Sequence, residues 1–218
     1  MISTTDQAAR LAGDARAELS QACRSIIDEL ASSTAPSAAF SAARDLVQQA
    51  VGILAEADHG RAYEGGEGSL AHYQEQLFID HSPLIGPLNP LAPPITIAID
   101  ATTVTGTVVF GGAYEGPPGC VHGGFIAAAF DEVLGVTQGM SGTPGMTARL
   151  TIQYRSPSPL HQELRFVGNI DHIDGRKIFT RGELRVAADD RLCAEAEGLF
   201  ISMNAEVFQR LMRDRGDA

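Results

Sequence analysis

The chain has 218 residues, of which 44% are hydrophobic and 20% are charged, a composition typical of a soluble globular protein with a sizeable core. Its formal net charge of −11 argues against nucleic acid as a partner, because binding to phosphates needs a basic face. No apolar run is long enough to span a membrane and the first residues lack the apolar stretch of a signal peptide, so we expect a cytoplasmic protein.

The cysteines and histidines indicate neither a disulfide framework nor a metal site. Cys23, Cys120 and Cys193 are odd in number and far apart, which predicts reduced thiols. The six histidines show no close ligand pair with a third partner, so we expect no metal. Cys120 is a conceivable nucleophile, but small buried cysteines are commoner and we interpret it as core filling.

Two helices are predicted within residues 1–57, where we expect a helical hairpin extension. Residues 5–31 are rich in alanine and carry an apolar stripe at helical spacing. After a break, residues 37–56 carry a second stripe, with Ser37 as the predicted N-cap. Each helix then has an apolar face that the main domain or a partner subunit has to cover.

A long connecting loop is predicted over residues 58–92. It contains a glycine-rich run at 65–68, and a proline-rich stretch from Ser82 to Pro94 runs just past its end. Loops of this length inside compact proteins usually have a function or link two parts of the chain.

Residues 93–203 are predicted to form one α+β domain, followed by a C-terminal tail at 204–218. The predicted strands are 95–99, 103–110, 146–154, 163–173, 177–187 and 192–203, and the predicted helix is 122–138. One long helix among consecutive hairpins indicates an antiparallel sheet wrapped around that helix.

The start of this helix is the strongest candidate site. Gly123 and Gly124 leave the first backbone N–H groups bare at the positive end of the helix dipole, where an acyl oxyanion would be stabilised. Asp131 follows Gly124 by seven residues, which places both on one face about 10 Å apart. A carboxylate in so apolar a helix is a functional candidate, whereas Glu132 is rotated by about 100° and is expected to face elsewhere.

The helix-in-sheet order and this motif resemble the hotdog-fold thioesterases of the PaaI type, in which a curved antiparallel sheet wraps a central helix. The resemblance covers roughly residues 93–203. It rests on His122-Gly123-Gly124, on Asp131 nine residues after the histidine, and on the stretch 146–157 that looks like the family's strand after the helix.

The resemblance implies a role for each of these residues. The amide of Gly123, together with that of Gly124, would bind the thioester oxygen. Asp131 would activate water or attack the thioester carbonyl itself, and the Thr147 hydroxyl would position the water or the substrate. His122 would orient the turn, and Glu132 is kept in reserve because some relatives use a glutamate in this helix.

One position departs from the family's pattern. Related enzymes often place an asparagine six residues before the histidine as a second contact to the carbonyl oxygen, and here that position is Gly116. We expect a backbone amide of this glycine-rich turn to replace the missing side chain.

The basic residues of the second half of the chain all lie after position 148 and offer a local positive patch despite the acidic total. The phosphates of coenzyme A would meet Arg or Lys near the surface, and we expect Arg155, Arg176 and Lys177 there. For any single arginine, a solvated strand face is an equally good interpretation.

The sequence therefore predicts an acyl-CoA thioesterase with coenzyme A as part of the substrate, no other cofactor, and a homodimer or a dimer of dimers as the working unit. A non-catalytic acyl-CoA-binding regulatory module is one alternative, although it would not need Asp131 and Thr147 together. A hotdog-fold enoyl-CoA hydratase is another, with His122 available as a base but without a clear acidic relay. A DNA-binding regulator is disfavoured because the N-terminal helices lie in the more acidic half.

Overall fold

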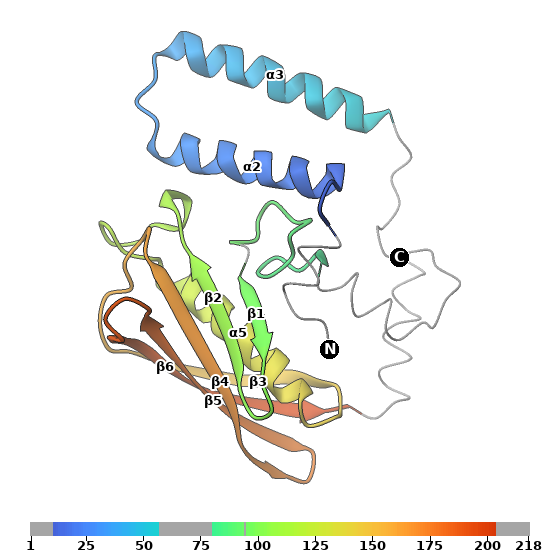
Figure 1. The fold of residues 1–218 in the computed structure, drawn as a ribbon, viewed down its shortest axis with the longest axis vertical. Helices are drawn as coiled ribbons and strands as arrows, with labels where there is room; N and C mark the ends of the chain where they lie inside the picture. The colour runs from blue at the N-terminus through green and yellow to red at the C-terminus, as the bar shows by residue number, and fades with distance from the viewer. Residues whose placement is uncertain (1–10, 57–79, 94, 204–218) are drawn as a thin grey trace.

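The computed structural model describes residues 11–56, 80–93 and 95–203, which form a curved six-stranded sheet, a central helix and a pair of N-terminal helices (Figure 1). All neighbouring strands are antiparallel, and the sheet order is β1-β2-β4-β5-β6-β3. The strands are β1 Thr96–Ile99, β2 Val104–Val109, β3 Gly145–Tyr154, β4 Glu163–Asp174, β5 Lys177–Val186 and β6 Leu192–Ser202. The predicted α+β class and the hotdog arrangement are confirmed.

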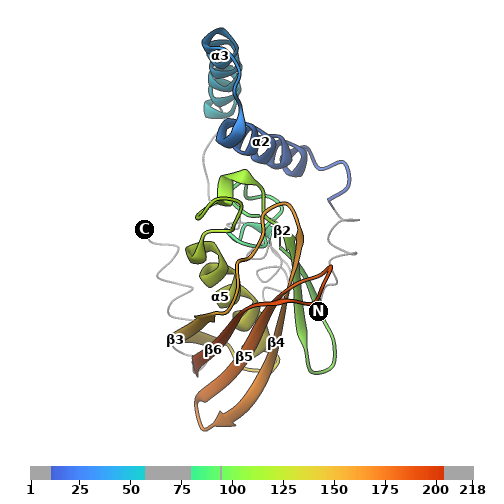
Figure 2. The same cartoon turned by 90° about the vertical axis from the view of Figure 1, so that its left-hand side faces the viewer.

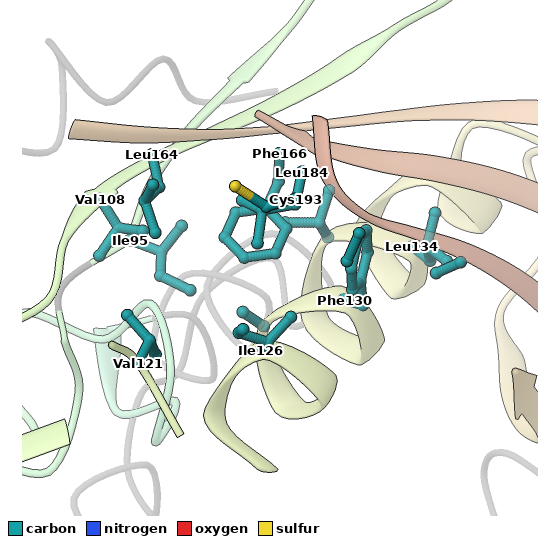
Figure 3. Close-up of a cluster of buried hydrophobic side chains, with 14 of the residues drawn as sticks. Ile95, Val108, Val121, Ile126, Phe130, Leu134, Leu164, Phe166, Leu184 and Cys193 are labelled. Atoms are coloured by element: carbon teal, nitrogen blue, oxygen red, sulfur yellow. The ribbon is translucent and has the colours of Figure 1, made fainter. Parts of the chain in front are cut away.

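Helix α5, Gly123–Gly139, lies along the concave side of the sheet (Figure 2). Its buried side chains recur at helical spacing and face the strands. The apolar residues whose spacing predicted this helix are therefore the ones that pack into the core. In Figure 3, Phe130 and Leu134 point toward Phe166 of β4 and Leu184 of β5. The rings of Phe130 and Phe166 meet edge to face, with centroids 5.0 Å apart. This packing fixes α5, and with it the candidate site, against the sheet.

A row of small residues lets α5 approach the sheet closely. Gly168 of β4 pairs with Gly182 of β5, which in turn pairs with Ala196 of β6. A Cβ atom on Gly182 would lie 3.2 Å from side chains of Phe130 and Leu134, so even one methyl group would crowd the helix. The glycines of this row are required by the close approach of α5 and not by a turn.

We expect Gly168→Ala to lower the free energy of unfolding by about 1–3 kcal/mol, because its methyl group would overlap the buried Thr137 hydroxyl, which donates to Val133 O at 2.8 Å. The control is Gly52→Ala in the second N-terminal helix, where a Cβ atom meets nothing within 4 Å. This exchange is expected to be neutral or to stabilise by about 0.5–1 kcal/mol. Urea denaturation of both variants gives the comparison, and equal stability of the two would contradict the packing argument.

Strand β3 is an edge strand with a bulge. It pairs with β6 on one side, and its other edge has no strand partner among the described residues. The register with β6 shifts between Thr147 and Arg149, so Ala148 is an extra residue. Thr147 and Tyr154 are seven positions apart, and strict alternation would place them on opposite faces of the sheet. The bulge places both on the face toward α5.

The first N-terminal helix, α2, begins later than predicted. Helix α2 spans Ala15–Ser32, and Asp14 caps it by accepting hydrogen bonds from the backbone N–H groups of Arg16 and Ala17. Of the predicted span 5–31, residues 5–10 lie outside the described residues and residues 11–13 form a turn, because the Asp14 cap starts the helix there. None of the described helices is both long and apolar enough to cross a membrane.

Helix α3, Ser37–Ala55, matches its prediction except at the cap. Pro36 occupies the N-cap position and its carbonyl accepts from the N–H groups of Ala39 and Phe40, so Ser37 is the first helical residue and the prediction of Ser37 as N-cap is wrong. Pro36 holds the extended conformation that a cap needs. No residue of α3 is buried, so its apolar face is not covered by the described part of the chain.

Helix α2 is attached to the main domain through polar contacts. The Ser20 hydroxyl donates to Leu88 O at 2.8 Å, and the Arg24 guanidinium donates to Pro87 O and Asn89 O. These acceptors belong to the proline-rich stretch 80–93, which consists mainly of turns. Residues 58–79 of the predicted loop 58–92 and the tail at 204–218 lie outside the described residues.

Candidate active site

The N-terminus of α5 is capped by His122. The ring nitrogen Nδ1 of His122 accepts a hydrogen bond from the Gly124 N–H at 3.0 Å, and the His122 carbonyl accepts from the N–H groups of Phe125 and Ile126. His122 thus caps the helix at the position where it was expected to orient the turn. The same contact corrects the prediction for Gly124, because its N–H group is engaged by the cap and is not free for a substrate oxygen.

The Gly123 N–H group is the free donor at this helix end. Its neighbours on both sides are hydrogen-bonded: His122 N–H to Tyr114 O, Val121 N–H to Ser158 O, and Gly124 N–H to the cap. Over positions 114–126, Gly123 carries the one backbone N–H group that has no acceptor among the described residues. It lies at the positive end of the α5 dipole, which suits an oxyanion.

The turn before the helix supplies no second donor. The N–H groups of Gly116, Gly119 and Cys120 are bonded to Cys120 O, Glu115 Oε1 and Pro117 O, and the two prolines between them have none. The prediction that an amide of this turn replaces the missing asparagine is therefore wrong. A Cβ atom on Gly116 would lie 2.7 Å from the Cα atom of His122, so this turn accepts only glycine there without a shift.

Tyr154, which the sequence did not single out, lies over the glycine pair. Its hydroxyl donates to Gly123 O at 2.8 Å, from the end of β3 that is nearest the start of α5. A Cβ atom on Gly123 would lie 3.2 Å from the Tyr154 hydroxyl, so the ring packs directly against this residue. The residue is 55% exposed. A tyrosine at the end of an amphipathic strand carries no signal of this contact in the sequence.

The acid predicted to act on the substrate is held by the residue predicted to assist it. The Thr147 hydroxyl donates to Asp131 Oδ1 at 2.8 Å, across the space between β3 and α5. The bulge in β3 turns Thr147 toward the helix. This contact leaves Oδ2 of Asp131 without a hydrogen-bond partner among the described residues, and the side chain is exposed.

Glu132, the residue after Asp131 in α5, lies in more buried surroundings than Asp131. Burial raises the pKa of the Glu132 carboxyl, a hydrogen bond with the Ser82 side chain opposes this rise, and the nearby charge of Asp131 adds to it. Both residues line the same groove, but Glu132 is bonded to Ser82 whereas Asp131 is bonded to Thr147 of β3, so the two carboxylates point in different directions. Only Asp131 is held by Thr147.

The groove has a volume of about 570 Å³ and runs between the second half of α5 and the start of β3. Its lining is the carboxylate pair and Thr147 together with mainly apolar or small residues: Ile85, Gly135, Val136, Gln138, Gly145, Met146 and Phe200. A groove of this kind, with a few polar groups at one place and apolar walls beyond them, can hold an apolar chain next to a reactive group.

Within one chain, the free amide and the carboxylate are far apart. The backbones of Gly123 and Asp131 are separated by about 12 Å along the helix. The strand residues that hold them, Tyr154 and Thr147, are about 20 Å apart along β3. The two halves of the site, the free amide and the carboxylate, are therefore held at opposite ends of the same edge strand.

The three basic residues expected to meet coenzyme A are not brought together. Arg155 follows the end of β3 and forms an ion pair with Glu195 at 2.6 Å. Arg176 and Lys177 lie at the turn between β4 and β5, where Arg176 donates to Ser202 O at the opposite end of the sheet. The register of the antiparallel strands separates these two places, so the three side chains of one chain cannot bind one phosphate group. No group of three metal-binding side chains is present in the described residues.

Comparison with known proteins agrees with this architecture. The family model described as "Thioesterase superfamily" matches residues 118–197, which include the α5 N-terminus, Asp131 and Thr147. A crystal structure of a thioesterase superfamily protein, RHA08564, is 35% identical in sequence and superposes with a TM-score of 0.71, covering 87% of this chain and 92% of that one. The chain belongs to the thioesterase superfamily. The narrower PaaI-type subfamily stays a prediction.

Curated relatives of this thioesterase superfamily chain match over a shorter length. Acyl-coenzyme A thioesterase THEM4 of Xenopus laevis is 39% identical over 89 residues, and THEM4 of Bos taurus is 37% identical over 97 residues. The matches cover 41% and 44% of this chain, and the chain spans only 40% of the length of each of these relatives. The crystal structure of RHA08564, by contrast, covers more of this chain than the domain 93–203 alone and thus extends into the N-terminal part.

Proposed function

We propose that this protein is an acyl-CoA thioesterase that hydrolyses a thioester to a free acid and coenzyme A. The observation that carries this proposal is the free N–H group of Gly123 at the positive end of α5, in a chain whose Asp131 is oriented by Thr147. The family membership and the acyl-CoA thioesterase relatives support it. A thioester carbonyl needs an oxyanion donor, a base or nucleophile and an apolar slot, and the described residues offer one of each.

In the proposed reaction, the carbonyl oxygen of the thioester accepts the hydrogen bond from Gly123. Asp131 takes a proton from a water molecule through its free oxygen while the water oxygen attacks the carbonyl carbon. The tetrahedral intermediate collapses, the carbon–sulfur bond breaks, and coenzyme A leaves as a thiolate that takes up a proton. Alternatively, the carboxylate of Asp131 attacks the carbon itself, the carbon–sulfur bond breaks and coenzyme A leaves as a thiolate that takes up a proton. Water then hydrolyses the resulting mixed anhydride, which releases the free acid and restores the Asp131 carboxylate.

We propose further that two subunits share each site. Among the described residues, strand β3 has a free edge. If a second copy paired with this edge in antiparallel fashion about a two-fold axis, the start of each β3 strand would lie beside the end of the other. The Thr147 end of one strand would then lie beside the Tyr154 end of the other. Asp131 of one subunit would thereby meet Gly123 of its partner, which removes the separation found within a single chain.

Mixing two inactive variants tests the shared site. We expect Gly123→Val and Asp131→Asn subunits, after exchange, to regain about one quarter of the wild-type activity, because half of the dimers are mixed and each mixed dimer holds one intact site. Steady-state CoA release before and after exchange measures the recovery. Each variant exchanged with itself is the control. No recovery despite proven subunit exchange, or an active monomer in sedimentation, would refute this arrangement.

The activity itself is tested by CoA release from short, long and aromatic acyl-CoAs, with an enoyl-CoA hydration assay alongside. A non-catalytic acyl-CoA-binding module would bind these thioesters without releasing CoA. A hydratase would need His122 as a base, but its Nδ1 atom accepts from Gly124 and no described carboxylate hydrogen-bonds to its ring. Hydration without CoA release would nevertheless overturn the thioesterase proposal.

A further inference from the structure

The peptide group between Gly123 and Gly124 is held at both of its ends from outside the helix backbone. Its carbonyl oxygen accepts the hydrogen bond from the Tyr154 hydroxyl at 2.8 Å. Its N–H group donates to His122 Nδ1 at 3.0 Å. The two contacts come from different elements, because Tyr154 belongs to β3 and His122 precedes α5.

These two contacts restrict a part of the helix that would otherwise be mobile. The first turn of a helix frays, and glycine has more backbone freedom than any other residue. The direction of the free Gly123 N–H group depends on the backbone angles of this first turn. The contacts at its oxygen and its nitrogen restrict rotation of this peptide plane. The preceding peptide, which carries the Gly123 N–H group, is held through the His122 carbonyl, so fixing the plane that follows leaves the N–H group little freedom to turn.

The surroundings of Tyr154 argue against a role in the core. The residue is 55% exposed, and the buried core cluster does not include it. The hydroxyl that reaches Gly123 O comes from a strand that is already held by its ladder with β6. The hydrogen bond therefore contributes mainly to the orientation of the glycine pair and little to the burial of apolar surface.

We propose that Tyr154 is a positioning residue of the thioesterase reaction, which fixes the peptide plane after Gly123 and thereby aims the free Gly123 N–H group at the substrate oxygen. The expected effect of Tyr154 on catalysis rests on the proposed function. Tyr154 acts through the backbone and need not touch the thioester.

Replacing Tyr154 by phenylalanine removes the hydroxyl and keeps the ring. We expect kcat to fall about three- to tenfold, the size of one neutral hydrogen bond, with KM and the melting temperature nearly unchanged. The matched control is Tyr114→Phe, because the Tyr114 hydroxyl also donates to a backbone carbonyl, Leu91 O at 3.2 Å, but not to the glycine pair. Its kcat is expected to stay within about twofold of the wild type. An unchanged kcat for Tyr154→Phe, or equal losses in both variants, would overturn the proposal.

A double-mutant cycle adds a test that a merely structural tyrosine would not pass. His122→Ala removes the other contact to the same peptide, so its effect on kcat should not be additive with that of Tyr154→Phe. The effects of His122→Ala and Tyr114→Phe should be additive. Additive effects in both cycles would contradict a shared action on one peptide group.

Amide hydrogen exchange separates this inference from the proposed function, since it needs no substrate. In Tyr154→Phe we expect faster exchange of the Gly124 N–H group than in the wild type, while the amides in the middle of α5 keep their protection. Unchanged exchange at Gly124 would overturn the positioning role even in an active thioesterase. Faster exchange in a protein that releases no CoA would instead overturn the proposed function and leave the structural role of Tyr154 standing.

Discussion

Replacing Asp131 by asparagine is expected to lower kcat for CoA release by about 10²- to 10⁴-fold, the usual cost of losing a general base. Asparagine keeps the shape of the side chain, and its amide oxygen can still accept the hydrogen bond from Thr147 that Asp131 Oδ1 accepts at 2.8 Å. The substitution therefore removes the negative charge with little change in packing. Because Asp131 is exposed, we expect the melting temperature to stay nearly unchanged.

The matched control for Asp131→Asn is Glu132→Gln in the next position of α5. Burial raises the pKa of Glu132, and a raised pKa alone would suit a general base. Geometry distinguishes the two carboxylates, because the exposed Asp131 is oriented by Thr147 of β3, whereas Glu132 is partly buried and bonded to Ser82. Near-full turnover in Asp131→Asn together with an inactive Glu132→Gln would show that the assignment is reversed.

Gly123→Val is expected to lower kcat about 10²-fold or more, equivalent to about 3 kcal/mol for the loss of an oxyanion donor. Any side chain at this position meets the Tyr154 ring, with 3.2 Å from its Cβ atom to the hydroxyl and 3.3 Å to Cζ. Valine would therefore displace the ring and crowd the free N–H group at the same time. Single-turnover rates of CoA release measure the effect on the chemical step.

The control for Gly123→Val is the same substitution at Gly139, at the other end of the same helix. A Cβ atom on Gly139 meets nothing within 4 Å, so this variant has a similar cost in helix propensity without a blocked donor. We expect its turnover to stay near that of the wild type. Unchanged turnover in a folded Gly123→Val protein would remove the Gly123 amide from the mechanism.

Local patterns in the sequence determined most of the main domain. Period-two alternation of β-branched residues predicted all six strands to within a few residues, and the apolar spacing around Phe130 predicted α5. The start of α2 was predicted too early, because an apolar stripe continues across the Asp14 cap whereas the backbone does not. Apolar periodicity reports which side chains can share a face, and it carries less information on where a helix begins.

The site also has features that could be predicted from the sequence and features that only the structure revealed. The sequence pointed to Gly123 and Asp131 through their types and spacing, and the resemblance to hotdog thioesterases added Thr147 and a turn-orienting role for His122. Only the tertiary structure decided that the Gly124 amide is already engaged, that the turn at Gly116 offers no second donor, and that Tyr154 holds the glycine pair.

The physical reason is that these outcomes depend on contacts between segments far apart in the chain. Tyr154 and Gly123 are 31 positions apart, and they meet because β3 returns along α5. The bulge at Ala148 turns Thr147 and Tyr154 to one face, although their odd spacing predicts opposite faces. Side-chain type and local periodicity are properties of the sequence, whereas the partner of each free donor and acceptor is set when the helix packs into the sheet.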